Sequence, residues 1–543
     1  MSSPLQPLVV ESCQDSTLGR IFSASPEVEN AISDEYGPVV PRRPWLSPLT
    51  SVLLRRDSII QRGHVKRDSL EFSKDYEVAS PTRALSPVDT HHGPPPERMK
   101  ARFACCFLAY FLCGWGDGVT GTVLPYLQAD FHLSYMLSSL LFVGTTIGFF
   151  LGTFMVERVL DYLGRFNVDK ARRSMGQQSP VFLSSSAKGG IGHSPSQARY
   201  ISLSLASILL CFHFVMMGSR SGFLVMFLAY VDAAFARAFL TASMNKFLAA
   251  GPPSSLGYAF AFWSFGGVSS PLVCQTIIST GVPWFHFYFG SLVVAGLSFI
   301  LVLFTFKPTT KEVISDFQLS LKHRRKSSSD SDVLPTATVV ESPKAAHTLK
   351  RALKMPYMWA FNIFVMLYCG SETTTQGFMV SYLLGTRNAN PNTAGYVTSG
   401  FWGGITISRL VWGYFTASLT FTQRKHILHA SINRCVALIM HLLIWFVPSN
   451  IENALSTAVI GTVYGPMFPA SLTQANEVLP PDVHMVSMAL ISAFGSLGSA
   501  LFPFVAGTVS SYEGVKMLTY VTVPLGVALV SMWAAFPARP PRC

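Results

Sequence analysis

Long apolar stretches separated by polar segments run along the chain from residue 102 to residue 537. Each stretch is close to the roughly 20 residues that an α-helix needs to cross the hydrocarbon core of a bilayer. The pattern predicts an all-α polytopic membrane protein with twelve transmembrane helices. We place them at residues 102–126, 134–157, 200–218, 222–248, 256–280, 284–306, 356–384, 394–416, 427–447, 451–474, 485–509 and 514–537.

Basic residues are concentrated in alternate loops of this pattern. The loops after the second, sixth and eighth segments and the end of the chain carry most of them, whereas the opposite side has Arg220, Arg387 and Lys516. Cytoplasmic loops of membrane proteins hold the excess of Lys and Arg. We therefore predict that both termini lie in the cytoplasm. This requires an even number of spans, which twelve satisfies.

The polar segments also predict the domain organisation. The first hundred residues are rich in Pro, Ser and charge and lack a sustained period, which is typical of a disordered tail. A charged, Ser-rich central segment divides the helices into two sets of six. The predicted parts are a disordered cytoplasmic tail (1–100), an N-terminal six-helix bundle (101–306), a cytoplasmic central loop (307–353), a C-terminal six-helix bundle (354–537) and a short C-terminal tail (538–543).

Two features qualify this picture. The two halves share a faint repeat, because the interval from Gly144 to Arg165 recurs from Gly403 to Arg424, and this favours a duplicated unit. The segment 166–198 joins two helices through more than thirty polar and small residues, where compact bundles use short connections. It is either an irregular, disordered insertion or an untranslated stretch retained in the gene model, and both interpretations stay open.

Composition narrows the class of protein. The chain has 543 residues, of which 49% are apolar and 13% charged. Its net charge of +12 lies in the loops and tails, so we expect no nucleic-acid partner. The nine cysteines have neither metal-ligand nor disulfide-framework spacing, and no nucleotide-binding loop or hydrolase motif is present. We therefore predict neither cofactor, metal nor enzymatic activity. The first 14 residues lack the basic start and apolar core of a cleaved signal peptide.

Three runs resemble a known family: GWGDGVTGTVLP in the first predicted helix, Gly370–Phe378 in the seventh and Tyr396–Phe415 in the eighth. They are similar to the major facilitator superfamily, in particular to a fungal branch related to fucose permeases that includes the bypass-of-stop-codon proteins. The resemblance implies two six-helix bundles around a central cavity that opens alternately to each side. It also implies transport that is often driven by protons, with sugars as the best-known substrates.

The chain departs from the family in the loop after the second helix. The family motif G-x-x-x-D-R-x-G-R-[RK] is represented by ERVLDYLGRF at 157–166, which keeps Asp161, Gly164 and Arg165 but lacks the basic residue after Asp161. The resemblance implies a gating role for Asp161 and Arg165 in this loop. We add Arg409 in the eighth helix to the gating set, as a residue between the bundles that contacts backbone carbonyls.

Two acidic residues stand in apolar helices, Asp117 in the first and Glu372 in the seventh. An unpaired charge at membrane depth costs at least about 2.5 kcal/mol, so such residues face a polar interior. Asp117 also matches a helix-one carboxylate that matters for transport in fucose permeases. We predict that both acids bind solute or protons, together with Gln376, which shares a helical face with Glu372. A purely structural, hydrogen-bonding role is the alternative for each.

The fourth predicted helix carries Arg237, Thr241 and Asn245 at intervals of four, which stacks them on one face. We predict that this face lines the same site, with Arg237 pairing with Asp117 or Glu372 or holding an anionic solute. Aromatic rings stack on sugar rings, so the set of predicted substrate-binding residues also includes Trp263, Trp402 and Tyr464. Packing or anchoring at the membrane interface is the alternative for these aromatic residues.

The sequence thus predicts a secondary active transporter that moves a small polar solute, with a sugar as the leading candidate, by alternating access coupled to protons. Its partners would be the solute, protons and the lipid bilayer, and we expect the plasma membrane rather than an internal one. Basic, serine-containing runs suggest cytoplasmic kinases acting on Ser58, Ser69 and Ser327. The alternatives are a transport-inactive sensor or scaffold, and an exporter of drugs or metabolites.

Overall fold

The computed structural model describes residues 98–167, 191–249, 251, 255–329, 349–416, 431–480 and 483–534. All of them belong to one compact unit, Thr90–Cys543. The predicted N-terminal tail up to residue 97, most of the 166–198 segment, part of the central loop and the C-terminal tail lie outside the described residues. The same is true of Ser58 and Ser69.

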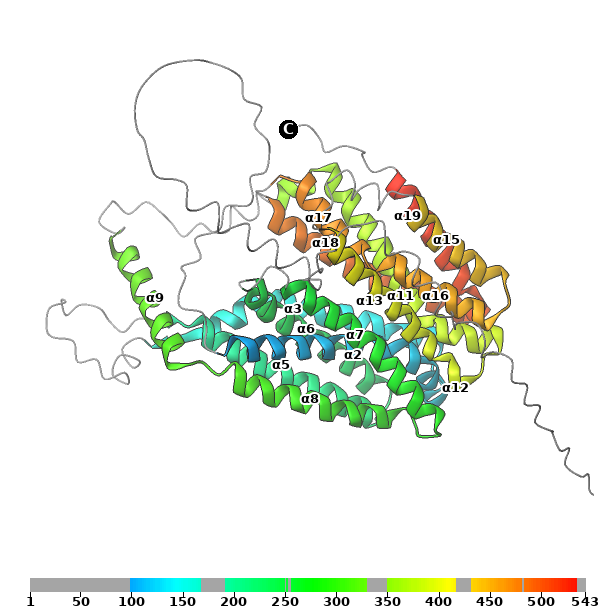
Figure 1. The fold of residues 1–543 in the computed structure, drawn as a ribbon, viewed down its shortest axis with the longest axis horizontal. Coiled ribbons are helices and arrows are strands. Elements are labelled where there is room, and N and C mark those ends of the chain that lie inside the picture. Colours follow the sequence, from blue (N-terminus) through cyan, green and yellow to red (C-terminus); the bar gives the residue numbers. More distant parts are fainter. Residues whose placement is uncertain are drawn as a thin grey trace, which may run out of the picture. The chain divides into compact units, whose positions relative to one another are not determined.

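Six long helices form what we call the first group. Helix α2 packs along α7, α3 packs along α6, and α5 lies against both α6 and α8 (Figure 1). Each covers a predicted spanning segment to within one residue at either end, and α5 begins at Pro195, five residues before the predicted start. The helices are α2 (Met99–Phe131), α3 (Tyr135–Gly164), α5 (Pro195–Gly218), α6 (Phe223–Ala249), α7 (Ser255–Ser279) and α8 (Phe285–Thr305).

The remaining helices after the central segment form the second group. Here α11 packs along α18, α13 along α16, and α15 lies against α16 and α19 (Figure 1). The elements are α11 (Pro356–Arg387), α12 (Pro391–Ala394), α13 (Tyr396–Thr416), α15 (Ser431–Phe446), α16 (Asn450–Tyr464), α17 (Met467–Val478), α18 (His484–Glu513), the 3₁₀ turn η3 (Val515–Met517) and α19 (Leu518–Ala534).

Seven helices of the described residues are long and apolar enough to cross a membrane: α2, α3, α5, α6, α8, α18 and the η3–α19 segment. Their outward surfaces carry large apolar side chains that water would not favour. Phe154 is 77% exposed, Val293 74% and Phe304 69%. Such continuous apolar surfaces are rare on soluble monomers and suit contact with lipid. The described chain is therefore a helical membrane protein.

The tenth predicted segment, 451–474, is interrupted. Helix α16 ends at Tyr464 and α17 begins at Met467, so Gly465 and Pro466 separate two shorter helices. Proline lacks the backbone N–H that a continuing helix needs, and its ring clashes with the preceding turn. The prediction of one unbroken helix here was wrong, and the break leaves the Gly465 carbonyl free to bind a side chain.

The most extensive contacts between the two groups are those of α2 with α11, α3 with α18, and α7 with α13. Hydrogen bonds between the groups gather around α12. The carbonyl of Pro391 accepts from Tyr126 Oη at 3.0 Å and from Gln275 Nε2 at 2.8 Å, and Thr122 Oγ1 donates to the Gly395 carbonyl at 3.1 Å. We call this region the α12 end.

The opposite end of the first group carries a further helix, α9 (Thr310–Ser329), within what we had predicted to be a central loop. Its Asp316 Oδ2 accepts hydrogen bonds from Ser194 Oγ at 2.6 Å and from Ser196 Oγ at 2.5 Å, at the start of α5. Two short antiparallel strands, β1 (Arg165–Asn167) and β2 (Ile191–His193), stand beside it. Residues 166–167 and 191–193 of the 166–198 segment therefore belong to a β-ribbon, and residues 168–190 lie outside the described residues.

Arg102 and Glu312 attach α9 to the beginning of α2. The guanidinium donates to both carboxylate oxygens, at 2.5 and 2.9 Å, and Arg102 is only 2% exposed. Burial alone raises the pKa of Glu312, but hydrogen bonds from Arg102 and Thr309 outweigh burial and hold that pKa below its ordinary value. The negative charge of Glu312 therefore stabilises the docked α9.

We expect this attachment to weaken in acid. Because the pKa of Glu312 is lowered on folding, its contribution is complete above the ordinary glutamate pKa of about 4.3 and is lost as the pH falls through the lower folded value. Glu312→Gln should reduce the free energy of unfolding by about 1–3 kcal/mol at pH 7 and should flatten the pH dependence of thermal unfolding below pH 5. Glu513→Gln, at an exposed acid on α18, serves as control, and an equal effect of both changes would contradict the assignment.

Candidate functional site

Asp117 of α2 and Arg237 of α6 form an ion pair in the interior of the first group. Arg237 is 9% exposed and Asp117 26% exposed. Breaking a buried pair leaves an uncompensated charge, so each residue makes the other tolerable within apolar helices. Of the partners predicted for Arg237, the structure selects Asp117.

Contacts of Gly118 and Trp115 fix the rotation of α2 about its axis, and this rotation turns Asp117 toward α6. A Cβ atom on Gly118 would collide with the backbone of Gly267, so this face of α2 lies directly on α7. On another face, Trp115 Nε1 donates to Ser291 Oγ of α8 at 2.9 Å. With these two faces occupied, the Asp117 carboxylate is left to meet Arg237.

The predicted face of α6 does lie along α2. Asn245 accepts a hydrogen bond from Tyr110 Oη of α2. Thr241 uses its hydroxyl on its own helix, donating to the Arg237 carbonyl at 2.7 Å. Tyr110 was not predicted from the sequence as a site residue, although it precedes Asp117 by seven residues and so shares its helical face.

Glu372 and Gln376 lie on α11, on the other side of the contact between the groups. Glu372 is partly buried and interacts electrostatically with Arg409. The backbone carbonyl of Gln376 lies directly against Gly121 of α2. The side-chain Oε1 of Gln376 is buried and has no hydrogen-bond partner among the described residues.

Two tryptophans lie at the contact of α7 with its neighbours. The Trp402 ring packs on Gly267 and is 5% exposed, and its Nε1 lacks a partner among the described residues. One turn earlier on α13, the hydroxyl of Thr398 is likewise buried without a described partner. Trp263 meets Tyr110 edge-on, with ring centroids 5.8 Å apart. The hydroxyl of Thr398, close to Gly121, was not foreseen from the sequence.

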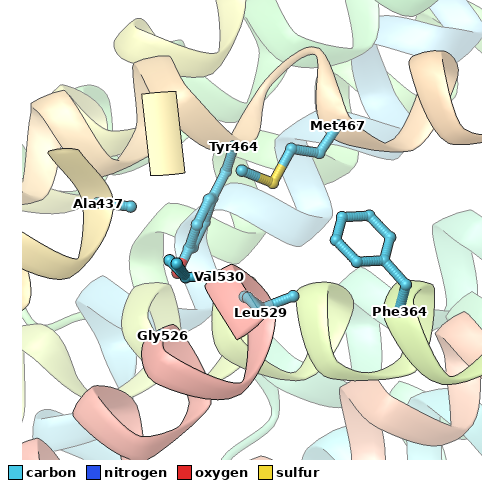
Figure 2. Close-up of a pocket in the computed structure, with 7 residues that line it drawn as sticks. All are labelled: Phe364, Ala437, Tyr464, Met467, Gly526, Leu529 and Val530. Carbon is cyan, nitrogen blue, oxygen red and sulfur yellow. The ribbon is translucent and has the colours of Figure 1, made fainter. Parts of the chain in front are cut away.

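Tyr464 does not join this set. Its ring is 1% exposed, and its hydroxyl is hydrogen-bonded to Ser371 Oγ at 2.7 Å and to His441 Nε2 at 3.2 Å. It borders a small apolar pocket inside the second group, together with side chains such as Met467 and Leu529 (Figure 2). The ring is therefore buried within the second group, and its hydroxyl is already hydrogen-bonded.

The residues of the predicted gating set lie apart. Asp161 and Arg165 pair with each other at 2.5 Å at the exposed end of α3, where solvent screens the attraction between the two charges. Arg409 instead bridges the groups, because it donates hydrogen bonds to Gly465 in the second group and to Ser264 in the first. Among the described residues, no three His, Cys, Asp or Glu side chains are placed to hold a metal ion.

Comparisons with known proteins agree with this fold. Residues 362–542 match the sequence model of the Major Facilitator Superfamily. Bypass of stop codon protein 6 of Saccharomyces cerevisiae is 21% identical over 452 residues, covering 81% of this chain and 83% of that protein. The structure of the nucleoside transporter NupG matches 81% of this chain and 98% of its own, with 13% identity and a TM-score of 0.54. A D-xylose-proton symporter matches 81% and 98%, with 12% identity and a TM-score of 0.53.

The fold is one that solved membrane transporters share. Residues 362–542 resemble the Major Facilitator Superfamily, and the similarity of the chain to a bypass-of-stop-codon protein is the one that its sequence motifs indicated.

Proposed function

We propose that this protein is a secondary active transporter that moves a small polar solute, with a sugar as the leading candidate, by alternating access coupled to protons. The observation that carries the proposal is the ion pair between Asp117 and Arg237 inside apolar helices. Charged side chains at membrane depth are costly, and in transporters they belong to solute or proton pathways. The pair lies in the first group of helices, whereas Glu372 and Gln376 lie on α11 in the second group.

The architecture we propose is twelve spans in two bundles of six, with α16 and α17 together forming the tenth span. In this arrangement both termini and the basic loops are cytoplasmic, as the distribution of Lys and Arg favours. The α12 end then faces outward. Because hydrogen bonds join the two groups at that end, we assign the structure to a state closed toward the outside.

Three buried polar atoms that have no hydrogen-bond partner among the described residues indicate the chemistry of the solute. Gln376 Oε1 accepts hydrogen bonds, Trp402 Nε1 donates one, and the Thr398 hydroxyl does both. A ligand bearing several hydroxyl groups would satisfy all three. The two opposite charges nearby already pair with each other, which favours a neutral solute. The fold shared with a D-xylose-proton symporter supports a sugar.

In the proposed cycle, Asp117 carries the proton. While ionised, its carboxylate holds Arg237. A proton that neutralises Asp117 removes the attraction and frees the guanidinium to donate to the solute. A ligand or proton shifts an equilibrium only through such a difference in interaction between the two states. The plasma membrane as location, and kinases acting on the tail and on Ser327 of α9, remain part of the proposal.

Uptake into proteoliposomes tests this function. We expect purified protein to accumulate a radiolabelled neutral sugar when the lumen is alkaline, and Asp117→Asn to abolish gradient-driven uptake while sugar exchange continues. Asp130→Asn is a matched control, since Asp130 also lies on α2 and pairs with Arg220 at 2.6 Å near the α12 end.

Two outcomes would overturn the proposal in different ways. Gradient-driven uptake that persists in Asp117→Asn would remove Asp117 from the proton pathway. If the wild-type protein moves no member of a broad panel of sugars and other polar solutes in either direction, transport itself fails and the sensor or scaffold alternative gains.

A further inference from the structure

Arg409 of α13 joins three helices with one guanidinium. Its Nε donates to the carbonyl of Gly465 at 3.2 Å, and its Nη1 donates to Ser264 Oγ at 2.8 Å. Gly465 lies at the break between α16 and α17, in the second group, whereas Ser264 belongs to α7 in the first. The side chain therefore holds the two groups together at a level well away from the α12 end.

The carbonyl of Gly465 anchors one side of this guanidinium. The carbonyls of the last turn of a helix lack intrahelical partners and carry the negative end of the helix dipole. A cation placed there is favoured, so the bond to Gly465 fixes Arg409 to the second group. The bond to Ser264 is different, since it exists only while α7 lies against α13.

A second partner for Arg409 lies within its own group. Glu372 of α11 is partly buried and interacts electrostatically with Arg409. Among the residues that the structure describes, the other titratable side chains that interact with Glu372 are Tyr368 and Cys369 of α11 and Tyr464 of α16, whose hydroxyl contacts His441 of α15. Arg409 is the cation of this set.

We propose that Arg409 exchanges Ser264 for Glu372 when the two groups part, and that the proton on Glu372 selects between these partners. With Glu372 ionised, the guanidinium is attracted away from α7. With Glu372 neutral, it stays on Ser264 and the contact between α7 and α13 is held closed. Glu372 is then a second proton-sensing position, separate from the Asp117–Arg237 pair. Its role in a transport cycle rests on the proposed function.

The exchange suits arginine in particular. A guanidinium presents five N–H donors in a planar fork, so one edge can remain on Gly465 while the other changes partner. A lysine at this position would keep the charge but not both bonds. The arrangement has two discrete states of one side chain, which is the kind of element that conformational switches use.

Hydrogen–deuterium exchange of the full-length protein in lipid nanodiscs tests the proposal without any transport assay. Amide exchange in residues 259–268 of α7, corrected for its intrinsic pH dependence, should be at least about threefold slower at pH 5.5 than at pH 7.5. At the lower pH, neutral Glu372 leaves the guanidinium of Arg409 on Ser264, and this charge-assisted hydrogen bond holds α7 against α13. In Glu372→Gln the slow exchange should persist at both pH values.

Matched variants identify the bond responsible. Ser264→Ala should raise exchange and abolish its pH dependence, whereas Ser269→Ala, on the same helix, should have no effect because the Ser269 hydroxyl bonds its own helix at Phe265, at 2.8 Å. Arg409→Lys should resemble Ser264→Ala. The proposal is overturned if Glu372→Gln retains the wild-type pH dependence, or if Ser264→Ala behaves like Ser269→Ala.

The failure of this inference can be told apart from that of the proposed function. If the wild-type protein takes up sugar but Glu372→Gln retains the wild-type pH dependence of amide exchange, the switch is rejected and the transport function stands. If amide exchange responds to pH and to the variants as expected but the protein moves no solute, the switch stands and the transport function is rejected.

Discussion

Replacing Arg237 alone by glutamine should destabilise the protein by about 3 kcal/mol, because removal of one partner leaves the partly buried charge of Asp117 uncompensated. Asp117 would remain between α2 and α6 without the guanidinium that it now contacts. The free energy of unfolding, measured by denaturation in mixed detergent micelles, should fall accordingly. A similar loss is expected for Asp117→Leu, which leaves Arg237 unpaired.

The double variant Asp117→Asn/Arg237→Gln provides the decisive comparison. Two neutral amides of similar size can hydrogen-bond to each other, so most of the stability lost in Arg237→Gln should return. This positive coupling in a double-mutant cycle would be accompanied by loss of gradient-driven uptake, because no titratable group is left at the pair. Additive destabilisation by the two changes would show that the residues do not depend on each other.

The pairing itself was partly foreseeable. Charges in apolar helices need partners, and the sequence offered Arg237 two acids, Asp117 and Glu372. What the sequence could not supply is the rotation of α2 and α6 about their axes. That rotation depends on close contacts such as Gly118 against Gly267, which join residues distant in sequence.

The broad positions of the helices followed from apolar length, because lipid tolerates few structures other than continuous helices. Helix α9 was not predicted, because its sequence is charged and lacks the apolar length of a membrane-spanning helix. A local signal was nevertheless present, since Thr309 and Glu312 form a capping box. Thr309 N donates to Glu312 Oε2 at 2.9 Å, and Glu312 N donates to Thr309 Oγ1 at 3.4 Å.

Other features differ in whether the sequence carried a local signal for them. The break in the tenth segment had a signal, as the Gly465–Pro466 dipeptide is a strong breaker of helices. The direction of Tyr464 had none, because its helix is apolar on several sides and only packing decides which side faces the second group's interior. The bond from Arg409 to Ser264 likewise joins residues 145 positions apart and leaves no local trace.

The contact between α2 and α11 gives the second large effect. Gly121→Ala should disfavour the state closed at the α12 end, because a Cβ atom there would overlap the backbone carbonyl of Gln376, which cannot rotate away. Overpacking of this kind costs about 1–3 kcal/mol. A cost of about 2 kcal/mol to one state alone shifts its population roughly thirtyfold. Hydrogen exchange in residues 388–396 should therefore increase, and gradient-driven uptake should fall at least about tenfold.

Two other glycines of α2 separate this effect from damage to the fold. Gly116→Ala should change nothing, since an added Cβ would find no atom within 4 Å. Gly118→Ala meets the backbone of Gly267 within the first group, so it should lower the unfolding temperature without a selective rise in exchange at 388–396. If Gly121→Ala and Gly118→Ala gave the same pattern, the contact between the groups would not control the closed state. A selective response to Gly121→Ala would instead show that closure depends on how near α2 can come to α11.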